Sequence, residues 1–346
     1  MAQAIQMQRK NDSGVYENYY PNTVMSQVEG NLQMKAKVVA ITGVANQTIA
    51  VSGDISQTIT TDNDGSVMIY LPYGNYTLTT ASKTKSLVID AIKVYNITFF
   101  DIESVLDDND WAIISAVSNA GLASNYWSIG DCKTITLNGT IGKNSYDNRD
   151  ICSFIVGFDH NIDIETNGEH SILFSCGKTD LTNGKDVALI DAFYNSYSVK
   201  PCFHMNPSGT NQNGWSECWM RDVLCPDFKA ALSSDLLGAL RTRTIYTYND
   251  YNLSETSDTI YLPSEFEIQG TITYAKPSEQ EKQQQFEYYK NGASKIRYDH
   301  DNSAVAVIWW TRSPSSTNSF CVVGATGASD YSSANYSYGF APCFTV

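Results

Sequence analysis

Short runs of β-branched and aromatic residues follow one another closely between residues 31 and 101. This spacing restricts the fold more than any other feature of the chain. The runs include 38–41, 67–71 and 95–100, and a strong turn sequence, 62–65, precedes the second of them. Short strands joined by tight turns form antiparallel sheets that pack face to face. The sequence therefore predicts a small β-sandwich over residues 31–101, which carries no visible site chemistry.

The hydrophobic period changes after residue 101. Trp111, Ile114 and Val117 recur at helical spacing, which predicts a helix near the start of a large domain, 102–346. A second helical region is expected over 226–241, where leucines form an apolar face. Between these helices lie short β runs separated by Gly, Asn and Asp. The predicted fold class is α+β.

A further helix is predicted over residues 283–290. The sequence Ser-Glu-Gln-Glu at 278–281 resembles a capping box before it, and Asn291 with Gly292 would end it. Residues 1–30 are polar and irregular, and we interpret them as an attachment arm.

Composition restricts the partners of the chain. Only 17% of the residues are charged and 12% are aromatic, which is typical of a folded chain. The net charge of -14 argues against a nucleic acid or an anionic membrane as partner, because both require clustered Lys and Arg. The sequence has no apolar run of transmembrane length and no signal-peptide core at its N-terminus. We therefore expect synthesis in the cytoplasm and no membrane insertion. If the protein leaves a cell, it does so by another route, and release by lysis as part of a particle is one such route.

All eight cysteines lie after residue 130, and none forms a CxxC pair. The four histidines are not at zinc-finger spacing from them. The sequence predicts reduced, buried thiols, with a disulfide between Cys321 and Cys343 as an alternative.

Six motifs occur in order along the large domain, and together they carry a resemblance. They lie at 127–135, 154–161, 214–221, 261–267, 309–314 and 339–344. This series resembles uncharacterised C-terminal domains of phages and prophages of gut bacteria, which look like members of the C-type-lectin-like fold shared with formylglycine-generating enzymes. Residues 31–101 in turn resemble the prealbumin-like or Ig-like modules of surface and virion proteins.

The resemblance implies a virion protein, such as a tail fibre or baseplate tip, built as a homotrimer. Its arm would bind other virion proteins, and its sandwich would act as a spacer or oligomerisation module. In the similar variable proteins of diversity-generating retroelements, the segment between a Trp-Arg motif and the final strand is hypermutated. The resemblance thus implies a diversified surface that recognises a host cell-surface protein or glycan.

The segment 315–338 has the chemistry that such a surface needs. Most of its residues are Ser, Thr, Asn, Asp or Tyr, and large aliphatic side chains are scarce. Tyr offers contact area with few torsions to order, and Ser and Asn offer adaptable hydrogen bonds. The predicted ligand contacts are Ser315, Ser316, Thr317, Asn318, Ser319, Asp330, Tyr331, Ser332, Ser333, Asn335, Tyr336 and Tyr338.

The flanks of this segment are apolar and are predicted to be scaffold. Trp309, Trp310, Arg312 and Phe340 are assigned structural roles, with the Arg312 guanidinium expected to bind loop carbonyls. The recognition surface is expected to be two polar loops, 315–319 and 329–338, held side by side by a buried strand, 320–323.

Enzymatic alternatives find little support in the sequence. Cys321 and Cys343 lack the surroundings of the formylglycine-generating pair, and Glu265 with Glu267 is a weak candidate for a glycosidase pair. No G-x-S-x-G motif and no EF-hand loop occur. We predict a non-enzymatic protein without a cofactor or an essential metal. The alternatives left open are a structural head fibre or decoration protein with weak glycan binding, and a cell-wall glycan hydrolase.

Overall fold

The computed structural model describes residues 7–10, 16–19, 35–178, 184–197, 202–249 and 252–346. The chain divides into two compact units, Met1–Phe99 and Phe100–Val346. Most of the predicted arm lies outside the described residues. Within it, β1 (Met7–Lys10) and β2 (Tyr16–Tyr19) pair as antiparallel strands.

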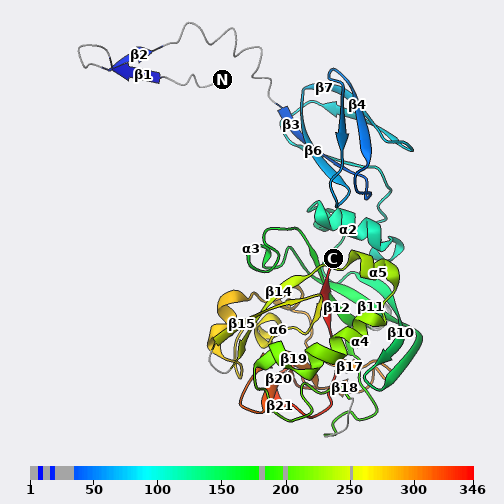
Figure 1. The fold of residues 1–346 in the computed structure, drawn as a ribbon, viewed down its shortest axis with the longest axis vertical. Coiled ribbons are helices and arrows are strands. Elements are labelled where there is room, and N and C mark those ends of the chain that lie inside the picture. Colours follow the sequence, from blue (N-terminus) through cyan, green and yellow to red (C-terminus); the bar gives the residue numbers. More distant parts are fainter. Residues whose placement is uncertain (1–6, 11–15, 20–34, 179–183, 198–201, 250–251) are drawn as a thin grey trace. The chain divides into compact units, whose positions relative to one another are not determined.

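Two sheets with one shared apolar core make up the first unit beyond the arm (Figure 1). One sheet has the order β6–β3–β9 and the other the order β5–β4–β7–β8. Burial alternates along β3 up to Ala40: Val38 and Ala40 are buried, and Val39 between them is half-buried. The predicted short strands are therefore confirmed, because the period of two places one side of each strand in the core. The strands are β3 (Lys35–Ile41), β4 (Thr48–Gly53), β5 (Gln57–Thr60), β6 (Ser66–Pro72), β7 (Gly74–Thr79), β8 (Thr84–Ile89) and β9 (Val94–Thr98).

The second unit mixes helices and strands, and strands predominate in several small sheets (Figure 1). Its largest sheet has the order β10–β11–β12–β22–β16. The last strand, β22, thus lies between two strands that come much earlier in the chain. These strands are β10 (Cys132–Ile141), β11 (Asn144–Phe158), β12 (Ile172–Lys178), β16 (Ile260–Tyr261) and β22 (Cys343–Thr345).

Three smaller sheets complete the second unit. One combines β13 (Val187–Ala188), β17 (Arg297–Asp299) and β18 (Ala306–Val307), and another pairs β14 (Arg243–Asn249) with β15 (Asn252–Asp258). The third consists of β19 (Trp309–Pro314), β20 (Ser319–Val323) and β21 (Ser329–Ser333), with β20 in the middle.

The helix predicted near the start of the large domain is confirmed as α2 (Trp111–Asn119). The Trp111 ring lies 5.5 Å from the ring of Phe174 in β12 and 6.0 Å from that of Phe344 in β22. Helix α2 therefore packs on the five-stranded sheet. The region predicted over 226–241 is two helices, α4 (Cys225–Ala230) and α5 (Ser234–Ala239). They separate because the Ser233 side chain caps the second helix by accepting a hydrogen bond from the Leu236 N–H.

The capping box predicted at 278–281 is wrong. Residues Pro277–Lys282 form a 3₁₀ turn, and the following helix, α7, is only Glu287–Lys290. A true capping box begins α6 (Glu265–Gln269), where Ser264 and Glu267 bind each other's backbone N–H groups. The other helical segments are η1 (Leu106–Asp108), η2 (Ala123–Asn125), α3 (Ile162–Glu165), η3 (Gly214–Glu217) and the π-helical turn η4 (Met220–Leu224). Among the described residues, no helix has the length and hydropathy to cross a membrane.

Candidate functional site

The sheet β19–β20–β21 contains the segment that the sequence singles out. All residues of β19 and β20 are buried, whereas none of β21 is. Residues 329–333 were expected in a loop, and this expectation is wrong, because they form β21 and pair with β20 along its length. The segment therefore exposes one strand at the edge of an otherwise buried sheet.

The four predicted scaffold residues, Trp309, Trp310, Arg312 and Phe340, are fully buried. Both indole N–H groups donate to backbone carbonyls, at 3.1 Å from Trp309 to Lys295 and 2.9 Å from Trp310 to Phe203. The Arg312 guanidinium binds the Leu262 carbonyl at 2.8 Å, as expected for that residue.

Arg312 also forms an ion pair that the sequence analysis missed. Its two terminal nitrogens lie 2.6 Å and 2.7 Å from the carboxylate oxygens of Glu267. Both side chains are buried. The pair joins β19 to α6, and removal of either partner would leave a buried charge unpaired.

The predicted contacts divide into three groups by exposure. The exposed positions are Ser316, Thr317, Asn318, Asp330 and Tyr331. The half-buried positions are Ser315, Ser332, Ser333, Asn335 and Tyr336. The buried positions are Ser319 and Tyr338.

Ser319 and Tyr338 are also predicted contacts, but both are buried, so the structure leaves little of either side chain accessible to a ligand. The Tyr338 ring packs 5.1 Å from Trp310 and stacks 5.8 Å from Tyr336, and its hydroxyl accepts a hydrogen bond from Ser332. Ser319 begins the buried strand β20. Tyr338 therefore forms part of the base on which Tyr336 rests.

Sequence analysis missed a loop, 206–213, that borders the exposed segment. The Asn206 N–H donates to the Ala334 carbonyl at 2.8 Å. The Asn211 side chain donates to the carbonyls of Ser316 and Ser319. The loop contains Ser, Thr, Asn and Gln, and Ser208 and Gln212 are exposed. Its composition resembles that of 315–319, and this likeness is the signal by which the loop could have been predicted as part of the surface.

Two tyrosines from outside the segment also lie beside it. Tyr197, with 62% of its surface exposed, has its ring 5.6 Å from that of Tyr336. Tyr274 is 37% exposed, and its ring lies 5.0 Å from the ring of Tyr331. The candidate surface comprises residues 315–318, β21, residues 335–336, the loop 206–213, Tyr197 and Tyr274.

Glu265 holds one side of this surface together. Its buried carboxylate accepts the backbone N–H groups of Thr273, Tyr274 and Ala275, at 3.1, 3.1 and 2.7 Å. It also accepts the hydroxyl of Ser329, the first residue of β21. A single carboxylate therefore connects the turn that carries Tyr274 to the strand that carries Tyr331.

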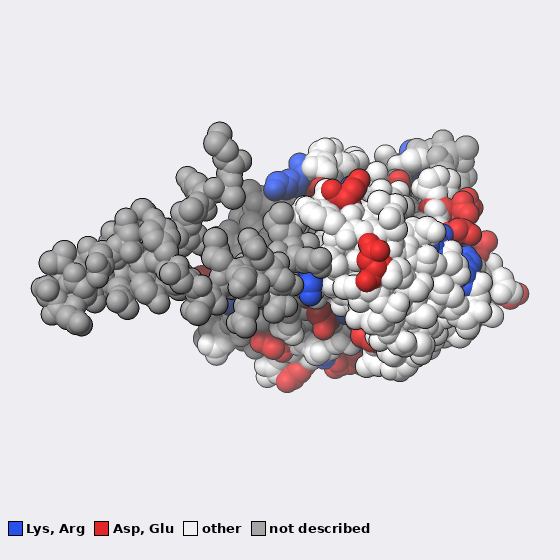
Figure 2. Space-filling model, turned by 90° about the horizontal axis from the view of Figure 1, so that it is seen from above, with Lys and Arg blue, Asp and Glu red and all other residues white. Residues whose placement is uncertain are grey.

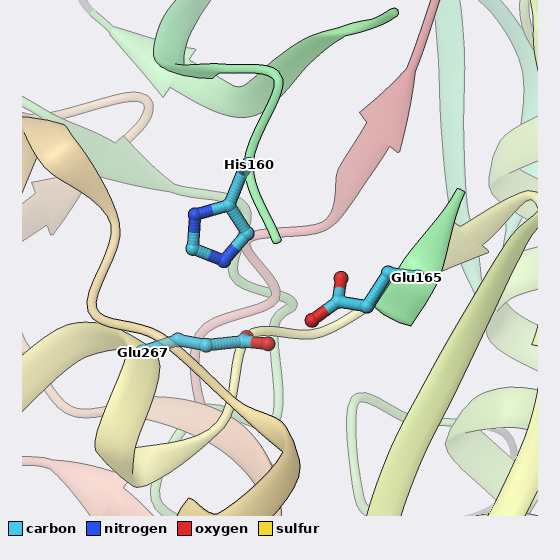
Figure 3. Close-up of side chains that lie close together, drawn as sticks. All are labelled: His160, Glu165 and Glu267. Carbon is cyan, nitrogen blue, oxygen red and sulfur yellow. The ribbon is translucent and has the colours of Figure 1, made fainter. Parts of the chain in front are cut away.

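His160, Glu165 and Glu267 form a buried cluster whose ligand atoms lie within 4.8 Å of one another (Figure 3). Burial and the nearby Arg243 lower the pKa of His160 to about 3, so its imidazole is neutral. Arg243 binds Glu165, and Arg312 binds Glu267. The two guanidinium groups already neutralise the carboxylates, which favours a structural ion-pair network over a metal centre.

A second group of this kind, Asp299, His300 and Asp301, lines an open cleft of about 610 Å³. Arg149 pairs with Asp301 at 2.9 Å, and the Ile190 N–H donates to His300 Nδ1 at 3.3 Å. These ligand atoms are thus engaged within the protein. The lining of the cleft contains none of the predicted contacts.

Cysteine states differ in part from the prediction. Cys132 and Cys152 form a disulfide across β10 and β11, which was not expected. The alternative pairing of Cys321 with Cys343 is wrong, because both are free and buried. Burial and the adjacent Glu265 raise the pKa of Cys321, which keeps it protonated and unreactive.

Charged side chains are scattered over the visible face of the protein in Figure 2. Figure 2 shows acidic and basic side chains dispersed among neutral ones on the visible face, without a continuous basic area among the residues described there. The expectation of no nucleic-acid partner rests on the net charge of -14 and stays a prediction.

Comparison with known proteins places the candidate surface within a region shared with other chains. Residues 188–346 match the model of DUF6273, a domain of unknown function. No curated protein matches the chain. A crystal structure of a DUF3823 family protein from Bacteroides ovatus ATCC 8483 is similar at 14% identity over 43% of this chain and 93% of that chain, with a TM-score of 0.17. A similarity of that size does not define the fold or the function.

Proposed function

We propose that this chain is a receptor-binding protein of a phage particle and that the candidate surface recognises a ligand on the host cell. One observation carries the proposal: tyrosines and short polar side chains gather on β21 and its neighbouring loops, over two strands that are completely buried. Tyrosine supplies contact area at a low cost in side-chain entropy. A rigid base further limits the ordering that binding requires.

The finer architecture belongs to the same proposal. We assign the first unit to a β-sandwich that spaces or trimerises the protein, and its two sheets with a common core support this. We assign the second unit to the C-type-lectin-like fold, and residues 1–30 to attachment within the virion. A homotrimer would present several copies of the candidate surface, so that a weak affinity at each copy adds to a strong attachment.

The geometry of the carboxylates supports a non-enzymatic role. Glu265 and Glu267 are each 1% exposed. Glu265 is occupied by backbone N–H groups and Glu267 by Arg312. A glycosidase pair would instead face a cleft that admits the sugar.

Adsorption of particles to host cells tests the proposal. The variant Tyr331→Ala with Tyr336→Ala removes two accessible rings while Tyr338 stays in the core. Truncating a tyrosine that acts as a hot spot of an interface costs about 2 kcal/mol or more, so adsorption should fall by at least about tenfold if these rings carry the binding. Tyr73→Ala is the matched control, because Tyr73 is 46% exposed but belongs to the first unit. Unchanged adsorption of the double variant would contradict receptor binding by this surface and favour the alternative of a structural head fibre or decoration protein.

Diversification by a retroelement is tested on the gene. Adenine-directed mutation of Asn codons yields Tyr, Asp, Ser and Thr, so codons in 315–338 should derive from AAY and match a nearby template repeat. A gene without such codons and without a repeat would exclude this mechanism and leave the binding proposal standing.

A further inference from the structure

β21 is an edge strand, so one side of its backbone faces away from the sheet. The Ala334 N–H donates to the Asn318 carbonyl at 2.9 Å, and the Gly324 N–H donates to the Ala328 carbonyl at 2.8 Å. Hydrogen-bonded pairs alternate along an antiparallel ladder. The residues of β21 that bond to β20 are therefore Asp330 and Ser332.

The remaining residues of β21, Ser329, Tyr331 and Ser333, direct their N–H and C=O groups outward. Two of these six groups are occupied. The Tyr331 N–H donates to the Asp330 carboxylate at 2.8 Å, and the Ser333 carbonyl accepts from the Tyr336 N–H at 3.1 Å. Among the described residues, no hydrogen bond engages the other four groups: both groups of Ser329, the Tyr331 carbonyl and the Ser333 N–H.

The side chains along this edge are mostly short. Ser329, Ser332 and Ser333 are short, and β21 is half-buried to exposed throughout. Tyr331 lies on one face of the sheet, beside Tyr274. On the other face the Ser332 hydroxyl bonds to Tyr338.

The ring of Tyr338 in turn stacks on Tyr336, so aromatic rings flank the edge on both faces. An extended chain running along β21 would place alternate side chains against these two aromatic groups.

We propose that the ligand of the candidate surface is an extended peptide segment of a protein, which adds to β21 as an antiparallel strand. This inference rests on the proposed function and specifies its partner. An antiparallel partner exchanges both hydrogen bonds with one residue, and Ser329 has both groups open for such an exchange. Strand addition supplies affinity through the backbone, while the flanking rings select side chains.

Asp330 has a defined part in this arrangement. Its carboxylate occupies the Tyr331 N–H, which a docked strand would bind through a carbonyl. Charged groups at sheet edges commonly prevent unwanted pairing. Asp330 is therefore a competitor of the peptide rather than a contact, and its removal should strengthen binding.

The test uses the full chain and a displayed library of random linear peptides, followed by Kd measurement on the tightest peptide selected. Asp330→Ala should lower Kd by about three- to tenfold, the size of one released hydrogen bond. Ser333→Pro removes an outward N–H at an edge position where proline is tolerated, and it should raise Kd by at least about fivefold. Ser333→Ala keeps the N–H and is the matched control, with Kd expected to change by less than about twofold.

Opposite results would overturn the inference. Weaker or unchanged binding by Asp330→Ala means that the peptide is held through side chains. If a folded Ser333→Pro variant binds as well as Ser333→Ala, the edge is not used. Selection of no peptide, with binding only to sugars on a glycan array, excludes a peptide ligand.

Receptor binding itself is judged separately, by host-cell adsorption of the double tyrosine variant. Adsorption that depends on the tyrosines while Asp330→Ala fails to tighten peptide binding would keep the proposed function and remove strand addition.

Discussion

β20 and β21 are neighbouring strands of five residues each, paired residue by residue, yet their surroundings are opposite. Every residue of β20 is buried, because protein covers both faces of the sheet there, including α6 on one face. β21 contributes its backbone to the same sheet and leaves its side chains accessible. The difference shows how a sheet separates stability from recognition: the inner strand is constrained on both faces, and the edge strand mainly through its hydrogen bonds.

The largest expected effect concerns the buried side of this comparison. Arg312→Met leaves the buried carboxylate of Glu267 without its guanidinium, and the free energy of unfolding should fall by about 3–5 kcal/mol. Unfolding in denaturant measures this loss of free energy. Arg149→Met, which breaks the exposed pair with Asp301, is the control and should cost less than about 1 kcal/mol. Equal losses in the two variants would contradict the importance assigned to the buried pair.

A second test concerns the buried ring of Tyr338 and compares two substitutions at that position. Tyr338→Ala removes a buried ring and should lower the free energy of unfolding by about 3 kcal/mol, whereas Tyr338→Phe should lose only the Ser332 hydrogen bond, about 1 kcal/mol. The thermal unfolding temperatures of the two variants distinguish the loss of the ring from the loss of the hydroxyl. A stable Tyr338→Ala protein with impaired binding would restore Tyr338 as a contact.

The third test concerns pH and a carboxyl group behind the sheet. Glu279 is fully buried, bonded to Ser313 of β19, and burial raises its pKa from 4.5 to about 7. Between pH 4.5 and 7 the Glu279 carboxyl is protonated in the folded protein and ionised in the unfolded chain. The contribution of Glu279 to stability therefore declines as the pH rises from about 4.5 to 7. Glu279→Gln should remove this decline, for a gain over the wild type of up to about 3 kcal/mol at pH 8.

This gain is measured as the difference between the unfolding curves of variant and wild type across pH. The difference matters because His160 titrates in the opposite sense: its lowered pKa makes stability rise with pH between about 3 and 6.5. A difference curve that is flat from pH 4.5 to 8 would show that Glu279 is ionised in the folded protein.

The smallest effect on stability is expected on β21 itself. Tyr331→Ala should change the free energy of unfolding by no more than about 0.5 kcal/mol, because the side chain is half exposed. The same variant should reduce host-cell adsorption. A loss of several kcal/mol would mean that the contact with Tyr274 is structural, and the contrast between β20 and β21 would then weaken.

Local patterns predicted local structure well. Short β-branched runs bounded by turn residues predicted the strands of 31–101, and the helical spacing of Trp111, Ile114 and Val117 predicted α2, because both signals are local in the sequence. The same S-x-x-E pattern occurs twice, at 264–267 and 278–281, and only the first caps a helix. At the second, Glu279 bonds to Ser313, so tertiary contacts decided between them.

Long-range pairing explains what sequence analysis missed. Composition alone could not show that Tyr338 is stacked in the core while Tyr336 lies above it. The loop 206–213 joins the candidate surface through Asn211 and Ser316, which are separated by 105 positions. Likewise, the disulfide between Cys132 and Cys152 follows from the β10–β11 hairpin, whose register no cysteine spacing reveals.

The place of β22 has a consequence for how the protein is made. Residues 343–345 lie between β12 and β16, and the Ile172 N–H donates to the Val346 carbonyl at 2.8 Å. During synthesis, β12 and β16 emerge long before β22, the strand that joins them. The five-stranded sheet can therefore be completed only after residue 345 has left the ribosome. Until then β12 and β16 each keep an unpaired edge. Because folding depends on contacts between distant parts of the chain, we expect it to be slow, and the unpaired edges expose the incomplete chain to aggregation.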